Sequence, residues 1–148
     1  MLMSSAPLSF IATFGDLNVY LGPSDQWTVQ RGPYTCDTAG LRAQASLLWL
    51  PLLEQDYLTF RQTVLTGLSS LGSEQATHRW ATFPVQELLL LALTAGASLY
   101  WVNLALAWAA EVGPGPEVLQ HVRALALDPS IPQPTRHRTK RLYYTGKC

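Results

Sequence analysis

The N-terminal part of the sequence shows the alternation of apolar and polar residues that is typical of β-strands. Two runs alternate in this way, with apolar residues at Phe10, Ala12 and Phe14, and then at Leu17, Val19 and Leu21. Turn-forming residues follow each run, at 15–16 and 22–25, and residues 26–30 have the composition of a short third strand. We therefore predict a small β-like segment over residues 8–31, which Gly32-Pro33 ends.

The period of the apolar positions becomes helical after residue 38. A first stripe consists of Leu41, Ala45, Leu48 and Leu52, and the clearest stripe consists of Leu53, Tyr57, Phe60, Val64 and Leu68. Leucine and alanine dominate this part of the chain, which favours helices over strands. Proline and glycine residues divide it into short helices, and a last helix is predicted over residues 135–144.

These patterns predict a mainly α fold, a compact bundle or stack of about five to six short antiparallel helices with the β-like segment at its N-terminus. We expect a single domain over residues 1–148, with its helical core at 38–127 and a basic tail or last helix at 129–148. Consecutive antiparallel helix pairs resemble a short stack of HEAT-like α-hairpins. No motif recurs at a fixed period, so this resemblance is one of architecture and assigns no residue a role.

The chain carries no charge between Leu88 and Ala110, which raises the question of a membrane span. One continuous helix there would be about 35 Å long, which is enough to cross a bilayer. Tyr100 and Trp101 lie near the middle of the run, whereas spanning helices carry such residues at their ends. Residues 95–97 offer a helix stop, and Ser98 is a suitable N-cap for a second helix. We predict two buried helices, and a single-span membrane protein with its span at 88–110 is the alternative.

Composition excludes a disordered chain, because 48% of the 148 residues are hydrophobic and only 14% are charged. A chain of this length buries enough surface to fold without a disulfide or a metal. Its two cysteines, Cys36 and Cys148, are too few for a disulfide framework. The first eight residues lack the basic residue that precedes the apolar stretch of a signal peptide. We therefore expect a cytoplasmic protein.

The sequence lacks the standard motifs of catalysis and metal binding. It has no glycine-rich phosphate loop, no G-x-G-x-x-G motif, no CxxC pair and no HExxH motif. We therefore predict that the protein is not an enzyme, and that it has no catalytic residue, no cofactor and no metal.

The formal net charge is zero, but the charges are unevenly distributed. All ten acidic residues lie at or before Asp128, with five basic residues among them. The remaining five basic residues lie in the last twenty residues, where there is no acid. Such asymmetry often marks an interaction tail, and an alternative is a tail that folds back on the acidic body and neutralises it.

The basic segment combines cations with tyrosines, a pattern that can bind a phosphate backbone and stack on bases, or dock on an acidic protein. Two tryptophans in polar surroundings, Trp27 and Trp80, are candidates for partner contacts at the surface, because tryptophan is favoured at interfaces. The predicted partner-binding residues are Trp27, Trp80, Arg136, Arg138, Lys140, Arg141, Tyr143 and Tyr144.

The sequence thus predicts a non-enzymatic binding protein that recognises another macromolecule, in first place a protein. In size and acidic charge it resembles small inhibitor or immunity proteins of bacteria, and an adaptor is a further possibility of the same class. The alternatives are a nucleic-acid-binding protein that uses residues 135–147, and the membrane protein described above. The sequence leaves open whether the chain forms homo-oligomers.

Overall fold

The computed structural model describes residues 8–94 and 98–146, with the backbone alone for Ser73 and residues 144–146. The chain divides into two compact units, Met1–Pro84 and Val85–Cys148. The first unit combines a sheet with helices, and the second is helical. The expectation of a single domain over residues 1–148 stays a prediction.

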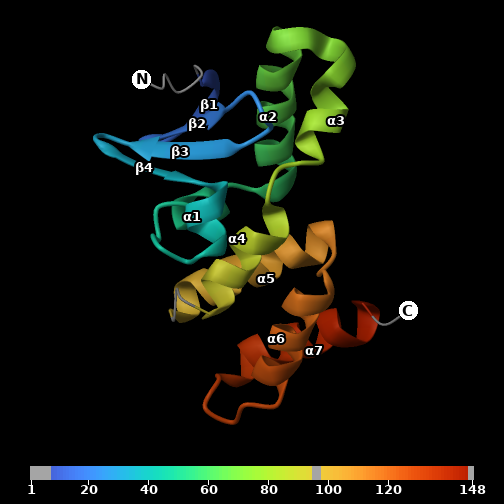
Figure 1. The fold of residues 1–148 in the computed structure, drawn as a ribbon. Helices are drawn as coiled ribbons and strands as arrows, with labels where there is room; N and C mark the ends of the chain where they lie inside the picture. The colour runs from blue at the N-terminus through green and yellow to red at the C-terminus, as the bar shows by residue number, and fades with distance from the viewer. Residues whose placement is uncertain (1–7, 95–97, 147–148) are drawn as a thin grey trace. The chain divides into compact units, whose positions relative to one another are not determined.

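The first unit is built on a four-stranded antiparallel sheet, whose strands follow one another in chain order (Figure 1). The strands are β1 (Ser9–Phe14), β2 (Leu17–Leu21), β3 (Trp27–Arg31) and β4 (Tyr34–Asp37). The predicted turn at residues 15–16 is confirmed, since Phe14 pairs with Leu17 across a two-residue loop. A five-residue loop joins β2 to β3, because Leu21 pairs with Trp27.

The expectation of a mainly α fold with a β-like segment at 8–31 is wrong, because a four-stranded sheet and helices together make a mixed α/β structure. Gly32-Pro33 does not end the sheet but forms the turn between β3 and β4, where Arg31 pairs with Tyr34. Gly32 has a φ of 58°, which fits glycine at the first central position of a type II′ hairpin turn. The sheet likewise rules out a pure stack of HEAT-like helix pairs.

The helical part of the first unit consists of α1 (Thr38–Arg42), η1 (Leu50–Glu54), α2 (Tyr57–Gly72), η2 (Ser73–Gln75) and α3 (Ala76–Trp80). Four members of the predicted stripe are buried on α2, at Tyr57, Phe60, Val64 and Leu68. The fifth, Leu53, is also buried but lies in η1, before α2 begins. The predicted helix with the stripe Leu41 to Leu52 is wrong. The backbone turns at Gln44, whose φ is 54°, and Ala45 is exposed.

Helix α2 packs on β1, and this contact explains a glycine in the middle of a helix. Phe14 and Phe60 bring the two elements together, with ring centroids 4.7 Å apart. A Cβ atom at Gly67 would collide with the carbonyl oxygen of Ile11, so the two backbones are in direct contact. Ile11 lies where the register of β1 and β2 shifts, as in a β-bulge. The helix can therefore approach the strand only with glycine at position 67.

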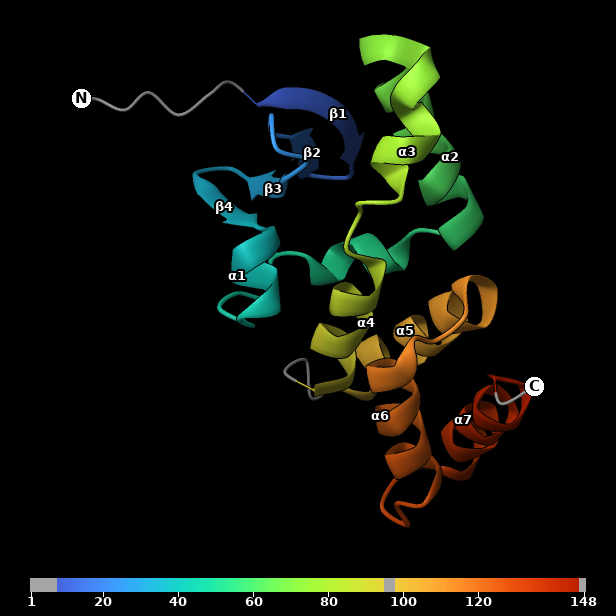
Figure 2. The ribbon, with the colours of Figure 1, turned by 45° about the vertical axis from the view of Figure 1, so that its right-hand side comes forward.

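The described residues of the second unit form the helices α4 (Val85–Thr94), α5 (Leu99–Val112), α6 (Pro116–Ala126) and α7 (Gln133–Gly146). Helix α4 contacts α5 and α6, and α7 contacts α5 and α6. Figure 2 shows α6 and α7 side by side. The Gln86 side chain ties α4 to the turn before α6, since it donates to the Gly113 carbonyl and accepts from the Gly115 N–H.

The uncharged run at 88–110 belongs to two helices, α4 and α5. The predicted N-cap is confirmed, because the Ser98 side chain accepts a hydrogen bond from the Tyr100 N–H. The predicted helix stop at 95–97 lies outside the described residues. Among the residues that the structure describes, no helix combines the length and the apolar character needed to cross a bilayer.

Candidate functional site

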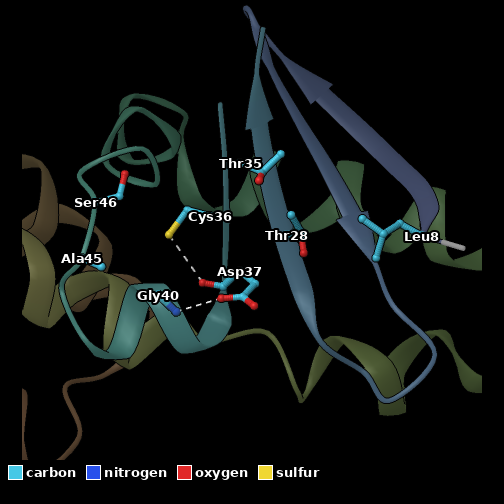
Figure 3. Close-up of a pocket in the computed structure, with 8 residues that line it drawn as sticks. All are labelled: Leu8, Thr28, Thr35, Cys36, Asp37, Gly40, Ala45 and Ser46. Carbon is cyan, nitrogen blue, oxygen red and sulfur yellow. Dashed lines mark hydrogen bonds between the residues drawn. The ribbon is translucent and has the colours of Figure 1, made fainter. Parts of the chain in front are cut away.

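A shallow pocket of about 540 Å³ lies beside the edge strand β4 (Figure 3). It is lined by Leu8, Thr28, Thr35, Cys36, Asp37, Gly40, Ala45 and Ser46. Two of these side chains could take part in chemistry, the Cys36 thiol and the Asp37 carboxylate. Their surroundings decide whether the pocket can be a catalytic site.

The Cys36 thiol is poorly suited to nucleophilic attack. Burial raises the pKa of Cys36, the nearby Asp37 carboxylate raises it further, and a hydrogen bond with Trp49 opposes both effects. The thiol therefore stays protonated at neutral pH, whereas the thiolate is the reactive form. The Asp37 carboxylate accepts a 2.8 Å hydrogen bond from the Gly40 N–H and caps α1. The two groups thus serve the local fold.

Residues 8–94 and 98–146 contain no group of three or more His, Cys, Asp or Glu residues placed to hold a metal ion. The prediction that no metal is bound is not thereby tested. The other candidate sites are the predicted partner-binding residues, which are Trp27, Trp80 and the residues of the basic segment.

Trp27 lies in the core, so the expectation that it lies at the surface is wrong. Its side chain is 0% exposed, and its indole N–H donates a 2.9 Å hydrogen bond to the Thr82 hydroxyl. Polar neighbours in the sequence suggested a surface position, but in a strand they point to the opposite face of the sheet. Trp27 and Val29 both point into the core, where the Trp27 ring contacts Phe83 with a centroid distance of 5.1 Å.

Trp80 is half-buried at the edge of the same aromatic cluster. Its ring stacks on Phe83, with centroids 5.1 Å apart and planes within 9°. Phe60 lies 6.1 Å from Trp80 and 5.3 Å from Phe83. Both tryptophans that the sequence proposed for partner binding therefore stabilise the first unit, and only Trp80 keeps part of its surface exposed.

The basic segment forms a helix, α7, which packs through uncharged side chains. Thr135, Thr139 and Leu142 are buried, and their spacing of four and three residues places them on one side of the helix. The Thr135 hydroxyl donates a 3.1 Å hydrogen bond to the amide oxygen of Asn103 on α5. The Thr139 hydroxyl donates a 2.7 Å bond to the Arg136 carbonyl. The buried residues of α7 are therefore uncharged, and at the margin of this side the Arg138 guanidinium donates 3.5 Å hydrogen bonds to Asn103 on α5.

The charges of α7 lie on the remaining sides of the helix. His137, Arg138, Lys140 and Arg141 are exposed, and we call these four residues the basic face of α7. The Arg138 guanidinium is held near the Asn103 carbonyl at 3.5 Å. Arg136 is half-buried, and its Nε donates a 3.0 Å hydrogen bond to the Ile131 carbonyl. The structure thus places Arg138, Lys140 and Arg141 on the exposed part of one helix, with Arg138 and Arg141 three residues apart, while Arg136 is half-buried.

Asp128, in the loop before α7, accepts hydrogen bonds from another residue of that loop. The Asp128 carboxylate accepts hydrogen bonds from the Ser130 hydroxyl at 2.7 Å and from the Ser130 N–H at 2.9 Å. These bonds lower the pKa of Asp128, and the charge of Arg136 lowers it further. Within the second unit, α7 therefore packs on other helices through Thr135, Thr139 and Leu142, and the attraction between Arg136 and Asp128 adds to this packing.

The structure adds one residue to this site that the sequence analysis missed. The Arg123 guanidinium of α6 lies over the ring of Tyr143 on α7, with its central carbon 5.9 Å from the ring centroid. Tyr143 is half-buried, and the side chain of Tyr144 lies outside the described residues. Twenty residues separate Arg123 from Tyr143, so only the packing of two helices reveals the pair.

Comparisons with known protein families, with curated proteins and with solved structures find no match for this chain.

Proposed function

We propose that the protein acts without catalysis, by binding a partner protein that presents an acidic surface to the basic face of α7. The observation that carries this proposal is the division of α7 into two sides. Neutral residues pack one side on α5 and α6, while Arg138, Lys140 and Arg141 remain exposed. Such a helix offers positive charge in a fixed geometry, which favours complementary association.

Two features support a protein partner over a nucleic acid. The second unit has six basic and four acidic residues in the sequence, a small excess beside the strongly basic domains that bind nucleic acids. The Tyr143 ring is half-buried and faces Arg123, so it is poorly placed to stack on a base.

Nucleic-acid binding is the second candidate function. It is favoured by the composition of α7, which carries four Lys and Arg residues and no acid. Contacts of these cations with phosphates would give an affinity that falls steeply with salt. Both candidate functions use the basic face of α7. They differ in the ligand, which presents carboxylates in one case and phosphates in the other.

Support for a non-catalytic role comes from the first unit. The pocket beside β4 places the protonated Cys36 thiol next to a carboxylate that is engaged in capping α1. A nucleophile needs a base within hydrogen-bond reach, and the Sγ atom of Cys36 instead donates to the Asp37 carbonyl at 3.6 Å.

The test is fluorescence anisotropy of a labelled polyglutamate peptide and of a labelled DNA duplex of equal charge, each titrated with the full chain. Polyglutamate stands in for an acidic protein surface. We expect polyglutamate to bind, and the charge reversals Lys140→Glu and Arg141→Glu together to weaken it about tenfold or more, because both side chains point to solvent.

The matched control reverses two charges of the first unit, Arg42→Glu and Arg79→Glu, and should leave the affinity within about twofold. Tighter binding of the duplex than of polyglutamate would favour the second candidate. Failure of both ligands to bind, or equal loss in the control variant, contradicts the proposal. Circular dichroism of each variant establishes that α7 remains folded.

A further inference from the structure

The pair of Arg123 and Tyr143 extends the positive surface from α7 to α6. Arg123 is exposed, and its guanidinium lies over the Tyr143 ring. An arginine held over an aromatic face in this way is stabilised by the ring quadrupole. The side chain therefore loses less conformational freedom when it binds a ligand than a freely moving arginine does.

Lys140 is an exposed cation of α7 that lies close to Tyr143 along the helix. It precedes Tyr143 by three residues, so the two side chains are neighbours on the helix surface. Side chains in helices lean toward the N-terminus, which places the Tyr143 ring over the turn that carries Lys140. Two helices thus supply exposed cations near the half-buried Tyr143, Arg123 over its ring and Lys140 one turn before it on α7.

Apolar surface lies beside this pair. Leu127 is the C-cap residue of α6 and follows Arg123 by four residues, about one helical turn. It is 70% exposed, the highest exposure among the large hydrophobic side chains of the described residues. Phosphate groups gain nothing from an exposed leucine, whereas a protein partner can bury it.

We infer that Arg123, which lies over Tyr143, and Lys140, one turn before Tyr143 on α7, form a two-helix site for neighbouring carboxylates of an acidic protein, with Leu127 as an apolar contact. Tyr143 is a positioning residue, which orients Arg123. The inference rests on the proposed function, and names the carboxylate chemistry and the residues of α6 that take part in it.

The test is a double-mutant cycle in the full chain, with labelled polyglutamate as the ligand. We expect Arg123→Ala to weaken binding about fivefold and Tyr143→Leu about threefold, because the latter leaves the arginine without its ring. Tyr143→Phe keeps the aromatic face and should restore binding to within about twofold of the unchanged protein. The double variant with Arg123→Ala and Tyr143→Leu should bind no more weakly than Arg123→Ala alone.

A second arm tests the apolar contact with a peptide that alternates glutamate and leucine. This peptide should bind more tightly per carboxylate than polyglutamate, and Leu127→Ala should remove the difference. Additive effects of the Arg123 and Tyr143 changes, or no loss with Arg123→Ala, would overturn the inference. If either result is found and charge reversal at Lys140 and Arg141 still weakens polyglutamate binding about tenfold, the proposed function stands while the inference fails.

Discussion

At the scale of single residues, the surroundings of a side chain decide its role more than its type does. Trp27 is of a type that is frequent at interfaces, but the sheet turns it inward and Thr82 satisfies its indole N–H. Cys36 is a potential nucleophile whose pKa is raised by burial. Arg123 has no distinguishing sequence pattern, yet its guanidinium lies over the Tyr143 ring.

The contact between Gly67 and Ile11 leads to a prediction at this scale. Replacing Gly67→Ala introduces a Cβ that meets the Ile11 carbonyl oxygen, so α2 and β1 must move apart. We expect a loss of about 1–3 kcal/mol in the free energy of unfolding, as for other overpacked sites. Urea denaturation measures it, with the exposed neighbour Thr66→Ala as the control. A Gly67 variant as stable as the control would refute the close contact.

At the scale of elements, the sequence predicted those whose local pattern determines their structure. The hairpin at residues 15–16 and the stripe of α2 were predicted, because turn residues and periodicity are local signals. Strand β4 was not, since four residues are too few to show alternation and Gly32-Pro33 can either end a sheet or turn it. The helix expected at Leu41 to Leu52 failed at Gln44, where the backbone has a positive φ despite a helical apolar spacing.

The candidate site likewise has features that the sequence could predict and features that it could not. The cations of α7 and their helical spacing were visible in the sequence, because a helix places its own residues three and four apart on one side. The buried position of Trp27 and the pairing of Arg123 with Tyr143 depend on how separate elements pack. No local pattern contains that information.

The loop that starts α7 leads to a pH-dependent prediction. The pKa of Asp128 is lowered by its hydrogen bonds with Ser130 and by Arg136, so the folded state favours the charged carboxylate. This contribution to stability is present above the usual pKa of an aspartate, and it is lost as the pH falls through the lowered value. Melting temperatures measured across this acidic range should fall less steeply for Asp128→Asn than for the unchanged protein.

The variant Ser130→Ala serves as the companion to this measurement. It removes the hydroxyl donor but keeps the backbone N–H bond to Asp128, so the dependence on acid should be reduced and not abolished. Identical pH profiles for all three proteins would show that the Asp128 loop does not stabilise the folded state.

At the scale of the whole molecule, a net charge of zero conceals an uneven distribution. The acids are spread along the chain up to Asp128, and the exposed cations concentrate on α7. Association through such a surface depends on ionic strength, because salt screens exposed charges. If the proposed function holds, recognition takes place on the basic face of α7, whereas the aromatic cluster of the first unit stabilises the fold.

The most direct test of this account is an NMR titration of the ¹⁵N-labelled full chain with polyglutamate. The largest shifts of backbone amides are expected over residues 136–143 and at Arg123, and they should shrink as salt is added. Amides around the pocket at Thr35 and Cys36 should stay in place. Shifts that concentrate at that pocket, or that spread evenly over both units, would contradict the assignment of recognition to the basic face of α7.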